Sequence, residues 1–124
     1  MSPLRELPDT RQIPGEPHRR WFNSPELDLI VWMGKDEELL GFQLCYDKHT
    51  GERALTWRAG RGFDHAAVDA GEDSPSKPKG TPILVADGAF PHERVSAIFN
   101  EASPEVPPHI RIFVTQAIQN YPRG

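Results

Sequence analysis

Five residues near the middle of the chain could together bind a small molecule. Trp32 offers an aromatic plane, Arg58 a guanidinium, and Gly41 a stretch of backbone with no side chain above it. Gln43 and Thr56 add hydrogen-bond donors and acceptors. Because an aromatic face stacks on planar groups and a guanidinium pairs with anions, this set predicts a site for a planar or anionic ligand.

His65 is a second candidate, for general-base catalysis. It follows Gly62-Phe63-Asp64, and Asp69 comes four residues later. A carboxylate that orients an imidazole is how many general bases are built. Residues four apart in a strand are about 13 Å apart, so this pair would need a turn between them.

The other reactive residues predict no further site. The five histidines lack metal-ligand spacing, so we predict no metal and no cofactor. Cys45 is the one cysteine, which excludes a disulfide within the chain. Its predicted neighbour Asp28 would raise the pKa of the thiol and make it a poor nucleophile.

Three short segments with a period of two must position the candidate side chains. Residues 28–33, 39–46 and 53–58 are rich in β-branched and aromatic residues, and turn residues separate them. This pattern predicts an antiparallel meander. Residues 62–68 and 82–86 are weaker strand candidates.

One pairing of these strands places every large aliphatic side chain on the same face, which predicts the register. The apolar face would then consist of Leu29, Val31, Met33, Leu40, Phe42, Leu44, Tyr46, Leu55 and Trp57. The second face would carry three cross-strand rows, Trp32–Gly41–Arg58, Ile30–Gln43–Thr56 and Asp28–Cys45–Ala54. Trp32 and Arg58 could lean together over Gly41. The alternative is that further strands or the 69–81 segment cover this face, and that Gly41 marks a bulge.

The apolar period changes to that of a helix after residue 90. Residues 95–102 and 110–121 both place apolar side chains at helical spacing, and Pro107 precedes the second segment. Strands first and helices last predict an α+β fold. We expect an antiparallel sheet of about four to six strands, with two C-terminal helices packed on one face.

Two segments differ in composition from the rest. Residues 1–20 contain four prolines and seven charged side chains, which predicts a flexible tail. Residues 69–81 lack large apolar side chains and predict a mobile loop. Residues 21–124 would then form a single domain, a size consistent with one hydrophobic core.

Charge and hydropathy limit the partners and the location. The net charge of −4 argues against a nucleic-acid-binding surface. No apolar run approaches the roughly 18 residues of a membrane span, and no basic start precedes an apolar stretch. These features predict a cytoplasmic protein.

Three functions remain open at this stage. The first is a non-enzymatic binding or interaction module for a small molecule or a protein partner. The second is an enzyme acting on an acidic metabolite, with His65 as base and Arg58 as anion clamp. The third is a subunit of a homodimer or other oligomer, paired through a sheet edge or a helix face.

Overall fold

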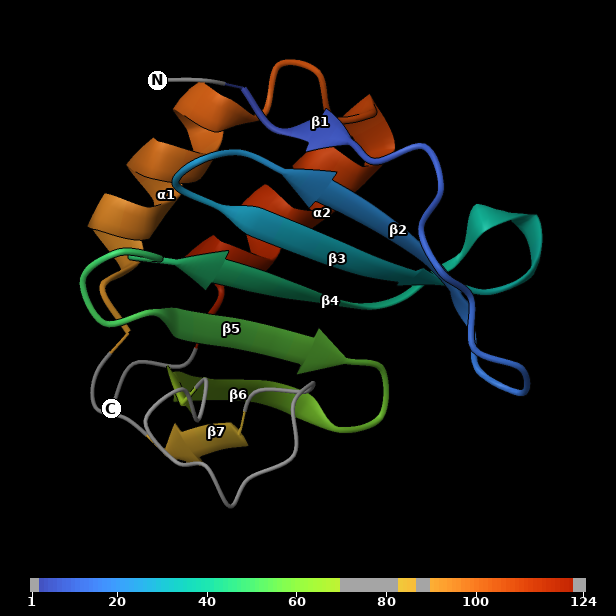
Figure 1. Ribbon diagram of the computed structural model, residues 1–124, viewed down its shortest axis with the longest axis horizontal. Coiled ribbons are helices and arrows are strands. Elements are labelled where there is room, and N and C mark those ends of the chain that lie inside the picture. The colour runs from blue at the N-terminus through green and yellow to red at the C-terminus, as the bar shows by residue number, and fades with distance from the viewer. Residues whose placement is uncertain (1–2, 70–82, 87–89, 122–124) are drawn as a thin grey trace.

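A computed structural model describes residues 3–69, 83–86 and 90–121 (Figure 1). Strands fill the first part of these residues and helices the last. The strands are β1 (Arg5–Glu6), β2 (His18–Asn23), β3 (Asp28–Met33), β4 (Leu39–Tyr46), β5 (Arg53–Arg58), β6 (Gly62–Asp69) and β7 (Ile83–Ala86). A 3₁₀ turn, η1 (Lys35–Glu37), joins β3 to β4, and the helices are α1 (His92–Ala102) and α2 (Pro108–Gln119).

The sheet is a meander, because each strand pairs antiparallel with its neighbours along the chain, from β1 to β7. Glycines allow two of the tight connections. Gly51 lies between β4 and β5 with a φ of 97°, and Gly60 lies between β5 and β6 with a φ of 82°. Glycine adopts such positive φ values without a steric penalty. The predicted α+β class and its initial meander are confirmed.

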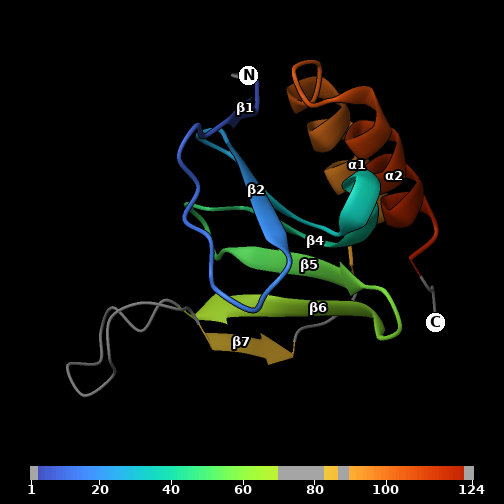
Figure 2. The same ribbon diagram turned by 90° about the vertical axis from the view of Figure 1, so that its right-hand side faces the viewer.

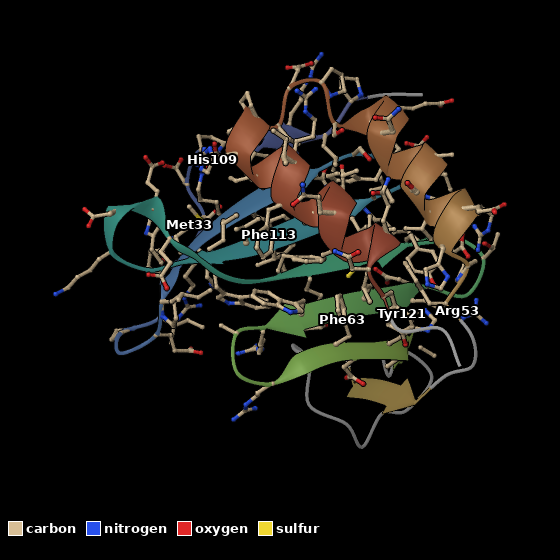
Figure 3. The ribbon with its side chains drawn as sticks, turned by 180° about the vertical axis from the view of Figure 1, so that it is seen from behind. Met33, Arg53, Phe63, His109, Phe113 and Tyr121 are labelled. Atoms are coloured by element: carbon tan, nitrogen blue, oxygen red, sulfur yellow. The ribbon has the colours of Figure 1, made fainter. Side chains whose placement is uncertain are left out.

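Both helices pack on the same face of the sheet (Figure 2). Phe99 of α1 and Ile118 of α2 are almost completely buried. Phe113 of α2 meets Phe42 and Trp57 edge to face, with ring centroids 6.3 and 5.0 Å apart (Figure 3). Burial of these apolar side chains supplies the main force that holds the helices on the sheet. Neither helix of the described residues is long and apolar enough to cross a bilayer.

The register on this face follows the prediction except at one end. The observed pairs include Val31–Phe42, Leu29–Leu44, Phe42–Trp57 and Leu44–Leu55. Met33 lies opposite Leu39 and not opposite Leu40, because a bulge shifts the register after Trp32. The bulge adjoins η1, where Asp36 takes a φ of 54°. Leu39 therefore packs on the core in the place expected for Leu40.

Part of the segment expected to form a flexible tail is packed on the domain. Leu4 is fully buried, and its N–H donates to the carbonyl of Ala102 at 2.7 Å. β1 pairs with β2, and the N–H of Leu7 donates to the carbonyl of Trp21 at 2.8 Å. These contacts consist of one buried leucine and a few backbone hydrogen bonds. The proline and charge content of residues 1–20 does not predict them, because it describes the segment as a whole and not a single apolar side chain.

Both weaker strand candidates are strands. β6 covers the segment predicted at 62–68 and extends to Asp69, and β7 begins one residue later than predicted. The loop predicted over 69–81 thus starts inside β6, and its remaining residues lie outside the described part of the chain.

An ion pair ties α1 to the turn between β4 and β5. Arg94 donates to the two carboxylate oxygens of Asp47 at 2.8 and 2.9 Å. Asp47 has a φ of 54°, in the left-handed region. The hydrogen bonds from Arg94 hold the pKa of the Asp47 carboxyl below its usual value, and the charge of Arg53 acts in the same direction.

We expect Asp47→Asn to lower the free energy of unfolding at pH 7 by about 1 kcal/mol. Asparagine tolerates the positive φ, so the substitution removes the charge and spares the turn. A carboxyl with a depressed folded-state pKa stabilises the native state above its unfolded-state pKa, and this contribution is lost as the pH falls through the folded-state pKa. The difference between variant and wild type should therefore shrink below about pH 4.

Denaturant unfolding at pH 7, 5 and 3 measures this difference. Asp36→Asn is the matched control, because Asp36 also has a positive φ but is exposed and has no ion pair within the described residues. The control should stay within about 0.5 kcal/mol of the wild type. A loss for Asp47→Asn that is the same at pH 3 as at pH 7 would show that the ion pair is not its cause.

Candidate functional site

The face of the sheet opposite the helices, here called the outer face, carries the three predicted rows. Figure 2 shows α1 and α2 together on one side of the twisted sheet, at the upper right, and the outer face is the side away from them. Each predicted neighbour is observed, and the rows are Trp32–Gly41–Arg58, Ile30–Gln43–Thr56 and Asp28–Cys45–Ala54. The five candidate ligand residues therefore share one face, as the alternation of side chains in strands requires.

Arg58 lies over the indole of Trp32, with its guanidinium carbon 4.3 Å from the ring centroid. Such a cation–π contact is worth about 0.5–1 kcal/mol at an exposed site. Arg58 is exposed and Trp32 is half-buried. The indole of Trp32 thus helps to orient the guanidinium of Arg58, which is exposed at the surface.

Gly41 is what allows this contact, because it lies between Trp32 and Arg58 in the row. A Cβ atom at position 41 would lie 2.6 Å from the carbonyl oxygen of Trp57 and 3.3 Å from Cε3 of Trp32. The indole therefore takes up the room that was expected above the glycine. The result is a cation–π pair beside Gly41, not a pocket with a glycine floor.

Gln43 and Thr56 form a hydrogen-bonded pair in the next row. The Thr56 hydroxyl donates to Oε1 of Gln43 at 3.2 Å, and Nε2 of Gln43 donates to Sγ of Cys45 at 3.6 Å. Thr56 is 9% exposed and Gln43 is half-buried. These bonds set the direction of the amide beside the Trp32–Arg58 pair.

One end of the outer face is basic. The start of β2 and the ends of β3 and β5 lie together at the right-hand end of the sheet in Figure 1. Arg19 and Arg58 lie in the row of Trp32 there, and Arg11 and Arg61 lie in adjoining loops. None of these four arginines makes an ion pair with a carboxylate of the described residues. Four other arginines of the described residues do have carboxylate partners, as Arg20 has Glu6 at 2.7 Å, whereas Arg111 on α2 has none.

The opposite end of the outer face is acidic. Asp28 accepts a hydrogen bond from Asn23 at 2.6 Å and pairs with Nζ of Lys48 at 3.2 Å. Burial raises the pKa of Glu52, and the neighbouring charge of Asp28 raises it further. At the other end of the face, Arg19 and Arg58 carry positive charge without a carboxylate partner within the described residues, and Asp64, opposite Thr56, carries one negative charge.

His65 lies on the other side of the sheet. It is opposite Leu55, whereas Arg58 is opposite Gly62, so the side chains of His65 and Arg58 point to opposite faces. His65 is 6% exposed, and its Nε2 lies 2.5 Å from the hydroxyl of Tyr46. The enzyme hypothesis required a base at His65 and an anion clamp at Arg58 in one cavity. Side chains on opposite faces of the sheet cannot line one cavity, so this arrangement is not present.

The ring of His65 belongs to an aromatic cluster between the sheet and the helices. Its centroid is 5.2 Å from that of Phe90 and 6.4 Å from that of Tyr121. Tyr121 in turn lies 5.4 Å from Phe63, and Figure 3 shows these two rings together at the end of α2. The cluster packs the end of α2 against β6.

Cys45 is a buried thiol on the outer face. It is 7% exposed, and burial raises its pKa to about 12. The thiol therefore stays protonated near neutral pH and is a weak nucleophile. In the ranges that the structure describes, no three side chains of histidine, cysteine, aspartate or glutamate converge on a position suited to a metal ion.

Residues 18–22 form a basic and aromatic segment in the sequence, in which the arginines were expected to point outward, but the sequence did not assign Arg19 to the ligand face. Arg19 extends the first row on the side of Trp32 away from Gly41. The available signal was the alternation in residues 18–23, where Phe22 is buried and Arg19 and Trp21 occupy the alternate positions. The prolines and charges of the preceding segment outweighed this signal.

Trp32, Gly41 and Arg58 thus form one cluster, with the Gln43–Thr56 pair beside it and Arg19 on its far side. No similarity to a known protein adds to this geometry: the chain matches no protein-family model, no curated protein and no solved structure.

Proposed function

We propose that this chain is a cytoplasmic, non-enzymatic binding module that holds a planar, anionic small molecule on its outer face. The observation that carries the proposal is the guanidinium of Arg58. It lies 4.3 Å from the ring centroid of Trp32, is exposed, and has no carboxylate partner within the described residues. A guanidinium held over a ring keeps its N–H groups in its own plane, where they can donate to both oxygens of a carboxylate or phosphate.

The surroundings of Arg58 favour a flat ligand. The indole of Trp32 and the guanidinium of Arg58 are each planar, and the amide of Gln43 beside them is held by Thr56 and Cys45. A planar group can stack on the exposed side of the pair while its anionic substituent faces the basic end of the outer face. Such an open platform leaves the ligand in contact with water, which suits binding better than catalysis.

Benzoate is a suitable first probe, because it is planar and anionic. We expect a saturable titration of the labelled protein in which amide shifts cluster at residues 30–32, 41–43 and 56–58. Benzamide keeps the ring without the charge, and cyclohexanecarboxylate keeps the charge without the flat ring. Both should bind about tenfold more weakly than benzoate, since each lacks one of the two contacts.

Arg58→Ala should weaken benzoate binding about tenfold, the value of one charge-assisted hydrogen-bonded contact. Arg111→Ala is the control for the loss of a positive charge, because Arg111 lies on α2 on the other side of the sheet. The control should bind benzoate as the wild type does. Shifts that cluster away from the outer face, or equal binding by Arg58→Ala and wild type, would contradict the proposal.

A further inference from the structure

Arg19 is a second arginine of the outer face that has no carboxylate partner within the described residues. It is half-buried, and its Nη2 donates to the carbonyl of Arg11 at 2.5 Å. Its Nε is buried and has no acceptor within the described residues, and no carboxylate of these residues pairs with it. A half-buried cation without a counter-charge is unfavourable, so an anion from outside the chain would stabilise it.

A pocket of about 350 Å³ has Arg19 in its lining. Arg19 and His18 of β2 line one side of the pocket, and the segment from Glu6 to Gln12 lines the other. Figure 2 shows this segment running along the side of the sheet away from the helices. The pocket therefore opens beside the outer face, with a volume within the range of small-molecule sites.

Two sets of contacts shape the pocket. The Gln12 side chain ties the segment that lines one side of the pocket to β2. Oε1 of Gln12 accepts from the N–H of Arg19 at 2.8 Å, and Nε2 of Gln12 donates to the carbonyl of Arg19 at 2.9 Å. Arg20 neutralises the Glu6 carboxylate at 2.7 and 2.8 Å. Asp9 is the other carboxylate of the lining, and it is exposed, where solvent and salt screen its charge.

The pocket and the stacked pair are neighbours. Arg19 lies opposite Trp32 in the register, one strand spacing of about 4.8 Å away. Arg58 reaches Trp32 from the other side, across Gly41. Two arginines without carboxylate partners within the described residues thus share one cross-strand row with Trp32: Arg58 lies over the indole, and Arg19 also lines the pocket.

We propose that the ligand is a nucleotide, whose planar base stacks on the Trp32–Arg58 pair and whose phosphate lies at Arg19. This inference rests on the proposed function and adds a second anchor to it. A phosphate matches the second anchor because it carries more negative charge than a carboxylate and offers several acceptor oxygens to the guanidinium, with His18 and Thr10 in the same pocket as further partners. A free nucleotide and a nucleotide unit of a single strand share this chemistry.

The test compares adenosine 5′-monophosphate with adenosine on the full chain by calorimetric or shift titration. The wild type should bind the monophosphate at least about tenfold more tightly than adenosine, the worth of one charge-assisted contact. Arg19→Ala should bind the two equally, at the wild-type affinity for adenosine. Arg19→Lys keeps the charge without the planar fork and should recover part of the difference. Arg111→Ala should match the wild type.

Arg58→Ala tests the platform separately from the phosphate site at Arg19, because the base of both ligands stacks on Arg58. Loss of the Arg58 side chain should therefore weaken the binding of adenosine as well as that of the monophosphate. If Arg58→Ala weakens both while Arg19→Ala retains the full preference for the monophosphate, the second anchor is wrong and the platform stands. If Arg58→Ala leaves both affinities unchanged, the platform itself is wrong. Thermal melting of each variant shows that a loss of binding is not a loss of the fold.

A single-stranded tetranucleotide, titrated in parallel, distinguishes the two sources of the ligand. Tighter binding than that of the monophosphate, lost in Arg19→Ala, identifies a strand as the source. Equal or weaker binding identifies the free nucleotide. Binding of the tetranucleotide that is unchanged in both Arg19→Ala and Arg58→Ala would place the contact elsewhere and overturn the proposal.

Discussion

Gly41→Ala should lower the free energy of unfolding by about 2–3 kcal/mol, near the upper end of the range for overpacking of a tight site. The added Cβ would lie 2.6 Å from the carbonyl oxygen of Trp57. A backbone atom of a paired strand cannot move away as a side-chain end can, so β4 and β5 must shift. Urea unfolding followed by circular dichroism measures the loss of stability.

Gly34→Ala is the matched control for this substitution. Its Cβ would also meet a close atom, Cδ1 of Leu40 at 3.1 Å, but that atom is the end of a flexible side chain. Gly34 has a φ of −98°, which alanine adopts freely. We expect a change of at most about 1 kcal/mol. Equal losses at positions 34 and 41 would show that the close contact with the Trp57 carbonyl is not decisive.

Leu4→Ala should lower the free energy of unfolding by about 2–4 kcal/mol, as buried leucine-to-alanine substitutions do. Leu4 is fully buried against the core although it lies in a segment rich in prolines and charges. The substitution leaves its backbone hydrogen bond to Ala102 in place, so the loss measures the side chain. Chemical denaturation at fixed pH gives the value.

Leu7→Ala tests the same substitution three residues later in the chain. Leu7 is 40% exposed, so its truncation should cost less than about 1 kcal/mol. A large difference between the two variants would establish residue 4 as part of the folded domain. A small effect at both positions would support the flexible tail expected from the composition.

The rows of the outer face could be predicted from the sequence because a slip of one residue would divide the apolar residues of the three strands between the two faces. In the observed pairing Leu29, Val31, Phe42, Leu44 and Leu55 share a face, and the short turns between the strands limit larger slips. Trp32, Gly41 and Arg58 then fall into line without further information. The candidate ligand residues were therefore placed correctly relative to one another.

Other features depend on contacts that a local pattern does not encode. The bulge that exchanges Leu39 for Leu40 arises at the turn of η1, whose positive φ values fall on Asp36 and Glu37 and not on a glycine. The position of His65 was open because both alternate sets of β6 contain apolar side chains, so the period of two does not select a face. The pocket at Arg19 needs the segment from Glu6 to Gln12 to fold back on β2.

The order of strands before helices affects how the chain is made. Translation adds about 5–20 residues per second, so several seconds separate the synthesis of β5 from that of α2. During that time the nascent sheet presents Phe42, Leu44 and Leu55 to solvent, because the side chains that cover them have not yet been made. Such a surface invites chaperones and self-association. A chain whose synthesis stops before residue 90 should therefore aggregate, even though it contains every residue of the Trp32–Arg58 platform.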